Sequence, residues 1–127
     1  MKLLHLSDLH IGKKVHGYSM LKEQKEILNQ ILLLCEKENP DIVLIAGDIY
    51  DKLVPGEEAV SVMDYFLTNL NKQKRNVFII SGNHDSGERL QFGKEIMRQK
   101  GIYIAGILEE ALDCVTLSDE WGRFNIY

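Results

Sequence analysis

Short apolar runs alternate with segments of helical periodicity over the first hundred residues of the chain. The runs cover residues 2–6, 41–46, 76–80 and 102–105. Between them, apolar residues recur every three or four positions, as in amphipathic helices. Continuous apolar runs of this length are typical of strands that are buried on both faces of a parallel sheet. The order predicts an α/β fold, with a layered, mainly parallel sheet in the sequence β-α-β-α-β-α-β covered by helices.

Local signals place the ends of the three expected helices. The first begins behind its N-cap Ser19 and stops at Asn39-Pro40, the second covers residues 57–71, and the third covers residues 89–100. Ser19 is a good N-cap, and Pro40 cannot continue a helix. Gly101 is expected to close the third helix. Residues 7–18 hold two glycines and are expected to form a long loop.

The pattern changes after Gly106. Residues 111–117 and 123–127 are expected to form two strands of a β-hairpin around a turn at residues 118–122. A chain of 127 residues is long enough for one domain with a core. Because the chain ends within apparent strand sequence, we expect residues 1–127 to be the N-terminal part of a single longer domain.

Composition narrows the class of protein only slightly. Apolar residues make up 45% of the chain and the net charge is −4, so no basic stripe indicates nucleic-acid binding. Bound divalent metals would supply positive charge that the sequence does not show. Cys35 and Cys114 are expected to be reduced core thiols. With no signal peptide and no run of transmembrane length, a cytoplasmic protein is expected.

Metal-ligand side chains follow three of the expected strands. The candidates are Asp8, His10, Asp48, Asn83 and His84. The carboxyl ends of parallel strands meet at one edge of a sheet, where ligands bind in open α/β folds. Asp8 and His10 would leave one side of an extended segment and reach the same ion. Carboxylate, amide and imidazole donors suit manganese or magnesium, and a central Asp48 could bridge two ions about 3.5–4 Å apart.

Each motif alone has an ordinary explanation. A loop Asp or His is usually solvated, Gly47-Asp48 is a common turn, and Gly82-Asn83-His84-Asp85 could cap a helix after a strand. Their occurrence in order, each behind a strand, is much more specific than any one of them.

Three segments together carry a resemblance to a known family. Residues 5–12 (HLSDLHIG), 47–51 (GDIYD) and 82–85 (GNHD) resemble the opening motifs of the calcineurin-like metallophosphoesterases, and most closely those of its DNA nucleases. The resemblance implies a four-layer α/β/β/α domain, of which this chain would be a truncated part. It also implies a double-strand exonuclease and single-strand endonuclease of DNA repair, recombination and replication. Such a nuclease uses Mn²⁺ (or Mg²⁺) and is stimulated by ATP through an ATPase partner subunit bound mainly by later segments.

The resemblance further implies a role for each matching position. Asp8 and His10 would hold one metal, Asp48 would bridge, and Asn83 would hold the second. His84 would face the scissile phosphate and stabilise the transition state or protonate the leaving oxygen. Asp85 is expected to orient His84 or cap the third helix.

Two departures from the family pattern limit these expectations. Asp51 stands where some relatives carry a histidine, so no catalytic role is expected there. The family completes both metal shells with later histidines, whereas this chain has His5, His10, His16 and His84. His5 is expected to be buried or to support a ligand, and His16 to be solvated. The incomplete ligand set predicts weak or single-metal binding and little nuclease activity for this chain.

Charged and apolar surface positions suggest partners. Lys13, Lys14 and Lys52 flank the proposed crevice and are candidates for phosphate contacts with DNA, or ordinary solvated charge. A spare apolar face is expected to support a homodimer, or else to be a wide core stripe. Its residues are Val62, Tyr65, Phe92 and Ile96.

Two other functions remain open at this stage. The first is another metallophosphoesterase, a phosphatase or a cyclic-nucleotide phosphodiesterase. Lys52-Leu53 occupies the place where protein phosphatases of the family carry an Arg-Gly pair, which disfavours a phosphatase. The second is an inactive dimerisation or folding module.

Overall fold

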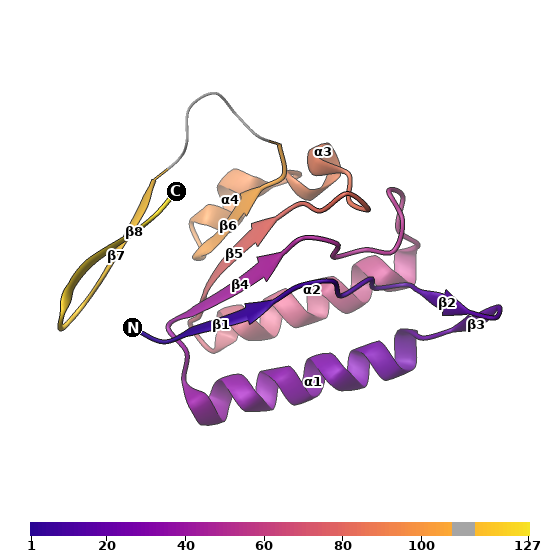
Figure 1. Cartoon of the computed structure of the whole chain (residues 1–127), viewed down its shortest axis with the longest axis horizontal. Coiled ribbons are helices and arrows are strands. Elements are labelled where there is room, and N and C mark those ends of the chain that lie inside the picture. The colour runs from indigo at the N-terminus through magenta and orange to yellow at the C-terminus, as the bar shows by residue number, and fades with distance from the viewer. Residues whose placement is uncertain (108–113) are drawn as a thin grey trace.

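A four-stranded parallel sheet forms the centre of the molecule. The computed structural model describes residues 1–107 and 114–127. The strands are β1 (Leu3–Leu6), β4 (Ile42–Ala46), β5 (Asn76–Ile80) and β6 (Ile102–Ala105), in the order β1-β4-β5-β6. All pairings are parallel, and all four strands point toward the same edge (Figure 1). The parallel sheet expected from the sequence is confirmed, and it brings the loops after β1, β4 and β5 to one edge.

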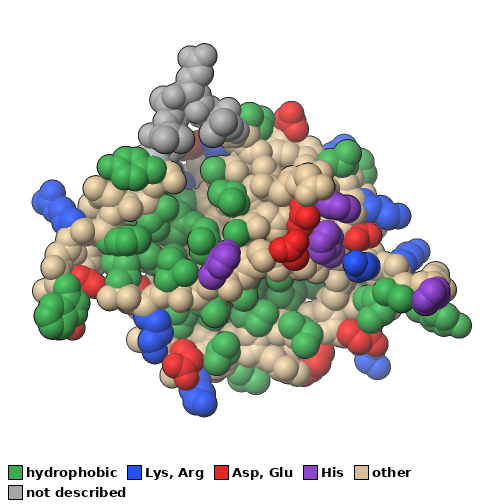
Figure 2. Space-filling view, in the orientation of Figure 1, with side chains coloured by type: hydrophobic (Ala, Val, Ile, Leu, Met, Phe, Trp, Pro, Cys, Tyr) green, Lys and Arg blue, Asp and Glu red, His purple; other side chains and the backbone are tan. Residues whose placement is uncertain are grey.

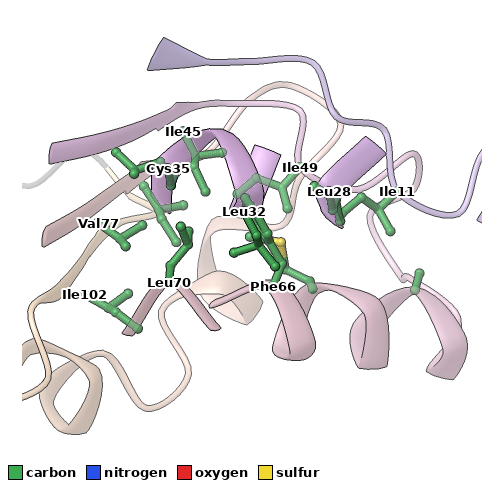
Figure 3. Close-up of a cluster of buried hydrophobic side chains, with 14 residues drawn as sticks. Ile11, Leu28, Leu32, Cys35, Ile45, Ile49, Phe66, Leu70, Val77 and Ile102 are labelled. Carbon is green, nitrogen blue, oxygen red and sulfur yellow. The ribbon is translucent and has the colours of Figure 1, made fainter. Parts of the chain in front are cut away.

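Two long helices, α1 (Leu21–Glu38) and α2 (Glu57–Lys72), cover one face of this sheet (Figure 1). Their buried side chains recur every three or four residues and pack against Val43, Ile45 and Val77 of the strands (Figure 3). The buried helix residues are Leu28, Leu32 and Cys35 of α1 and Ala59, Met63, Phe66 and Leu70 of α2. Full burial of one such large side chain contributes roughly 1.5–3 kcal/mol, so this interface is a main source of stability.

Helix α1 ends as expected but begins differently. Its N-cap is Met20, whose side chain makes no capping hydrogen bond, so the prediction that Ser19 is the N-cap is wrong. Ser19 belongs instead to a short strand. At the other end, Asn39 is left-handed, and its N–H donates to the carbonyl of Cys35 at 3.0 Å, directly before Pro40.

The expected loop over residues 7–18 contains part of a small hairpin. Strand β2 (Lys14–Val15) pairs antiparallel with β3 (Tyr18–Ser19). The two turn residues, His16 and Gly17, have φ values of 49° and 84°. Positive φ at both turn positions matches the turn type that two-residue hairpins favour, so the expectation of an irregular loop is wrong here.

The third expected helix is two short helices rather than one. Helix α3 covers Gly87–Leu90 and α4 covers Lys94–Arg98. Gly93 between them has a φ of 74°, a left-handed conformation that interrupts a right-handed helix. The prediction of a continuous helix over residues 89–100 is therefore wrong. Gly101, with a φ of 75°, ends this region as expected.

A β-hairpin follows the sheet, as the sequence predicts. Strands β7 (Val115–Asp119) and β8 (Gly122–Ile126) are antiparallel, and Asp119 pairs with Gly122 around a two-residue loop. The Asp119 carboxylate accepts the N–H groups of Trp121 at 2.9 Å and Gly122 at 3.1 Å. Its other oxygen accepts the α-amino group of Met1 at 2.7 Å. Residues 111–113, expected in the first strand, lie outside the described residues.

The sheet face opposite α1 and α2 carries apolar side chains beside this hairpin (Figure 2). Leu3 and Ile80 are 47% and 45% exposed. A pocket of about 340 Å³ lies between this face and the hairpin, lined by residues that include Phe78 and Val115. His5 is exposed, so the expectation that it is buried is wrong. The continuous apolar runs predicted a sheet buried on both faces, but in the described residues the face opposite α1 and α2 is partly exposed.

Two residues expected on a free apolar face lie against other parts of the chain. The Tyr65 hydroxyl donates to the side chain of Asn29 on α1 at 3.0 Å, and Val62 packs against the core. Tyr65 is 39% exposed and Val62 is half-buried, so the dimer face expected from the sequence stays a prediction for these two residues. Phe92 and Ile96 are free as expected, with exposures of 85% and 72%.

The two cysteines are free thiols in different surroundings. Cys35 is buried in the core, and burial raises the pKa of its thiol. Cys114 is exposed, so the expectation that both are core thiols is wrong for Cys114. No helix in residues 1–107 and 114–127 is both long enough and apolar enough to cross a membrane.

Candidate metal centre

The loops that follow β1 and β4 run side by side beyond the end of the sheet. The Asp8 N–H donates to the carbonyl of Gly47 at 3.1 Å, and the His10 N–H donates to the carbonyl of Asp48 at 2.9 Å. These bonds continue the parallel pairing of the two strands past their carboxyl ends. We call the three segments with the expected metal ligands, residues 5–12, 47–51 and 82–85, the metal motifs. The two hydrogen bonds bring the first two of these motifs into direct contact.

Three of the expected ligand residues have an unusual backbone conformation. Asp8, His10 and Asp48 are left-handed, with φ values of 54°, 43° and 50°. For residues other than glycine this conformation costs about 1–3 kcal/mol each, and it persists where the surroundings hold it. The expectation that Asp8 and His10 leave an extended segment is wrong. Two left-handed residues, with one residue between them, bring their side chains together instead.

The donor atoms of these residues converge at the sheet edge. The His10 Nε2 lies 3.9 Å from the Asp8 Oδ1 and 3.8 Å from the Asp48 Oδ2. One donor atom each from His10, Asp48 and His84 lie within 4.8 Å of one another. Figure 2 shows histidine and acidic side chains gathered at this edge. Imidazole and carboxylate donors at such spacing fit a divalent cation.

Asp48 lies at the centre of this cluster because two glycines allow the loops to approach. The Asp48 Oδ1 accepts the main-chain N–H of His84 at 3.0 Å. A Cβ at Gly82 would collide with the Asp48 carboxylate and main-chain nitrogen, and a Cβ at Gly47 would lie 3.0 Å from the Gly82 Cα. Any side chain at Gly82 would therefore displace Asp48.

Asp85 is buried and holds the loops after β4 and β5 together. Its carboxylate accepts the N–H groups of Ile49 at 3.1 Å, Tyr50 at 2.9 Å and Gly82 at 2.9 Å. Of the two roles expected for Asp85, orienting His84 or capping the third helix, the second is wrong, because the Ser86 hydroxyl caps α3. Asp85 supports the metal motifs through their main chain.

Asp51 contacts both histidines of the cluster. Its main-chain carbonyl lies 3.2 Å from the His84 Nδ1, and its Oδ1 lies 3.7 Å from the His10 Nδ1. The two rings meet edge to face, with centroids 5.0 Å apart. An Nδ1–H on His84 that donates to this carbonyl leaves the Nε2 free. The sequence indicated no role for Asp51, and only its place in the GDIYD segment could have suggested one.

Tyr50 lies in the loop after β4 and packs against the hydrophobic core. Burial, followed by the nearby carboxylates of Asp85 and Asp64, raises the pKa of Tyr50 to about 12. The phenol therefore stays neutral at physiological pH and is not a base.

The remaining expected site residues lie on the surface around the cluster. Asn83 is exposed and stands between Gly82 and His84. Lys13 and Lys52 are exposed in the loops after β1 and β4, and Lys14 is exposed in the short strand β2. His16 is exposed in the turn of the β2–β3 hairpin, in agreement with its expected solvation.

Comparisons with known proteins agree with this geometry. The model of the calcineurin-like phosphoesterase family matches residues 1–125. The chain is similar to the SbcD subunit of the nuclease SbcCD of Staphylococcus epidermidis, with 40% identity over 119 residues, 93% of this chain and 32% of that protein. It is also similar to the SbcD subunit of the same nuclease of Staphylococcus saprophyticus, with 33% identity over 120 residues, 94% of this chain and 32% of that protein.

The matches cover different shares of the relatives and of this chain. The chain spans about a third of the length of the curated relatives it matches, at 32% of each. The family model, in contrast, covers nearly the whole chain, including all three metal motifs. The parallel sheet, the clustered donors at its edge and this match lead to one conclusion: the chain belongs to the calcineurin-like phosphoesterases.

Proposed function

We propose that this chain carries part of the active site of a metal-dependent DNA nuclease, which hydrolyses phosphodiester bonds in DNA repair and recombination. The observation that carries the proposal is the cluster of His10, Asp48 and His84 at the sheet edge. The similarity to a subunit of the nuclease SbcCD over 93% of the chain supports a nuclease.

The expected ligand set would hold divalent metal ions, Mn²⁺ in the first place and Mg²⁺ as the alternative. Asp8 and His10 would hold one ion, Asp48 would bridge, and Asn83 would hold the second. Such ions supply Lewis-acid stabilisation of the phosphate and activate water. The Asp48 side chain is 14% exposed and the Asp8 side chain is 68% exposed, so both a half-buried and a solvent-accessible carboxylate would be available to hold such ions.

His84 would act on the phosphate itself. Its ring is exposed, and its Nδ1 faces the main-chain carbonyl of Asp51. The Nε2 would donate a proton or a hydrogen bond to an oxygen of the scissile phosphate, where negative charge develops in the transition state. The Asp51 carbonyl holds the ring so that this nitrogen stays available.

We expect the nuclease to act on double-stranded DNA together with an ATPase subunit, SbcC, since the relatives are named as one subunit of the nuclease SbcCD. Lys13, Lys14 and Lys52 are exposed and lie within a few residues of His10 or Asp48 in the sequence, and their side chains would contact DNA phosphates. The family resemblance implies further histidine ligands, which these 127 residues do not include. We therefore expect weak or single-metal binding and little nuclease activity from these 127 residues alone.

The test compares three substrates with the full-length protein in Mn²⁺: linear double-stranded DNA, a phosphopeptide and a cyclic nucleotide. We expect DNA cleavage, and Asp48→Asn should lower it roughly 100-fold or more, as for the loss of a main electrostatic contribution to the transition state. Asp64→Asn, an exposed Asp on α2, is the matched control and should keep wild-type activity. Cleavage of the phosphopeptide or the cyclic nucleotide without cleavage of DNA would contradict the nuclease proposal. It would indicate a phosphatase or a cyclic-nucleotide phosphodiesterase instead.

We also propose that the protein forms a homodimer through an apolar surface beside α2. Leu53, Val60 and Phe92 are 57%, 45% and 85% exposed. All three line one pocket of about 300 Å³. A second copy would cover these side chains from water, which a monomeric protein rarely leaves exposed as a contiguous patch.

A further inference from the structure

The side chain of Gln24, in the first turns of α1, makes three hydrogen bonds to the main chain of the loop after β1. Its Nε2 donates to the carbonyl of His10 at 2.7 Å and to the carbonyl of Leu9 at 3.2 Å. Its Oε1 accepts the N–H of Gly12 at 3.0 Å. One amide side chain therefore satisfies three main-chain groups within four consecutive residues.

This loop needs such a partner because of its backbone conformation. Asp8, His10 and Gly12 all have positive φ, at 54°, 43° and 94°. A segment that alternates in this way cannot pair all its carbonyl groups as a regular strand or helix does, and buried or half-buried carbonyl groups require partners. Gln24 supplies a partner to the carbonyl of Leu9 and a second partner to the carbonyl of His10, which also accepts the Lys13 N–H at 3.1 Å. These bonds oppose relaxation of the loop toward ordinary φ values.

The rigid core holds Gln24 in place. Gln24, Leu28 and Leu32 are spaced by four residues and lie on one face of α1. The two leucines are 2% and 7% exposed and belong to the main hydrophobic cluster. The packing of α1 on the sheet thus sets the position of Gln24. The three hydrogen bonds of Gln24 in turn fix the loop after β1 relative to α1.

We propose that Gln24 is a positioning residue for the metal ligands Asp8 and His10, acting only through their main chain. The inference rests on the metal site of the proposed function. Residues that orient metal ligands from outside typically change metal affinity by about 10–100-fold when they are mutated.

The test uses two substitutions and a matched control in the 127-residue chain. Gln24→Met keeps the length of the side chain but removes all three hydrogen bonds. Gln24→Glu keeps an acceptor for Gly12 but replaces the donor to two carbonyl groups with a carboxylate. Gln30→Met makes the same exchange at an exposed position of α1, where the side chain contacts Glu26.

Two readouts separate positioning from general stability. Mn²⁺ affinity is measured from the free-ion signal in electron paramagnetic resonance, and amide hydrogen exchange is measured at Gly12 and along β4. In both Gln24 variants we expect Mn²⁺ affinity to fall about 10–100-fold. In Gln24→Met we also expect faster exchange at Gly12, with unchanged exchange in β4. Gln30→Met should leave both readouts at wild-type values.

Each contrary result has a distinct meaning. Wild-type Mn²⁺ affinity in both Gln24 variants would overturn the positioning role and leave the proposed metal site intact. Faster exchange throughout β4 in the Gln24 variants would also overturn it, since the loss would then be global. A wild-type chain that takes up no Mn²⁺, alongside a full-length protein that does, would remove the inference for this chain but not the proposed function.

Discussion

At the residue scale, the side chains of the candidate site were predictable, whereas their backbone was not. The sequence predicted that His10, Asp48 and His84 meet because strand ends coincide at the edge of a parallel sheet. It did not predict the left-handed conformation of His10 and Asp48. Nor did it predict the hydrogen bonds of Gln24 and Asp85, because these depend on contacts between loops that are distant in the sequence.

Gly82 provides a direct test of how closely the loops approach. Gly82→Ala should weaken Mn²⁺ binding and lower the free energy of unfolding by roughly 1–3 kcal/mol, as overpacking does, because the added Cβ collides with Asp48. Gly56→Ala is the control, since a Cβ there meets no atom within 4 Å. Calorimetric Mn²⁺ titration and thermal unfolding would measure both effects. Wild-type affinity in Gly82→Ala would contradict the close packing of Asp48 and Gly82.

At the element scale, periodicity predicted the strands, the two long helices and the C-terminal hairpin. It failed where one residue changes the course of the chain. Gly93 was compatible with a helix by spacing, but its positive φ separates α3 from α4. The β2–β3 hairpin was missed because its strands are two residues long, too short for an alternating pattern.

The contact of the Met1 amine with Asp119 should make the position of the β7–β8 hairpin depend on pH. A hydrogen bond from the amine is the largest cause that lowers the pKa of Asp119, and the same bond raises the pKa of the amine. Because the pKa of Asp119 is lowered in the folded chain, its carboxylate stabilises the contact at any pH above the ordinary Asp value of 3.8. This stabilisation is lost as the pH falls through the pKa that Asp119 has in the folded chain. Because the pKa of the Met1 amine is raised in the folded chain, the charged amine stabilises the contact at any pH below its ordinary value of 8.0. This stabilisation is lost as the pH rises through the pKa that the amine has in the folded chain.

Trp121, the single tryptophan of the sequence, reports on this hairpin. Asp119→Asn keeps an acceptor for the turn but loses the charge that binds the amine. We expect its fluorescence anisotropy at neutral pH to fall to the value that the wild type shows at the acidic and basic extremes. Glu120→Gln is the neighbouring control and should behave as the wild type does. An anisotropy unaffected by both pH and Asp119→Asn would refute the contact.

At the scale of the whole molecule, the class of fold followed from the order of elements, but the use of its surfaces did not. The described residues centre on a four-stranded sheet, with the long helices α1 and α2 on one face and the β7–β8 hairpin beside the other (Figure 1). Apolar runs in β4 and β5 suggested equal burial on both faces, yet Ile80 is 45% exposed. Spacing alone could not tell that Tyr65 contacts Asn29 of α1 and is 39% exposed while Phe92 is 85% exposed, because that depends on how helices pack.

The proposed homodimer can be tested at Phe92. Phe92→Asp places a charge in the apolar surface with Leu53 and Val60, and burying an unpaired charge in an interface is strongly unfavourable. We expect sedimentation at tens of micromolar to show a dimer for the wild type and a monomer for Phe92→Asp. Leu33→Asp, at a position on α1 that is 64% exposed, should remain dimeric. A wild-type chain that sediments as a monomer would exclude the dimer.

The left-handed residues beside the sheet edge have a consequence for protein engineering. Grafting the side chains of Asp8, His10, Asp48 and His84 onto the strand ends of another parallel sheet would transfer the donor groups without their arrangement. The recipient would also need a glycine next to the central aspartate and polar side chains that form hydrogen bonds to the main chain of the loops. A successful transplant would therefore have to carry Gln24, Gly82 and Asp85 along with the groups that bind the metal.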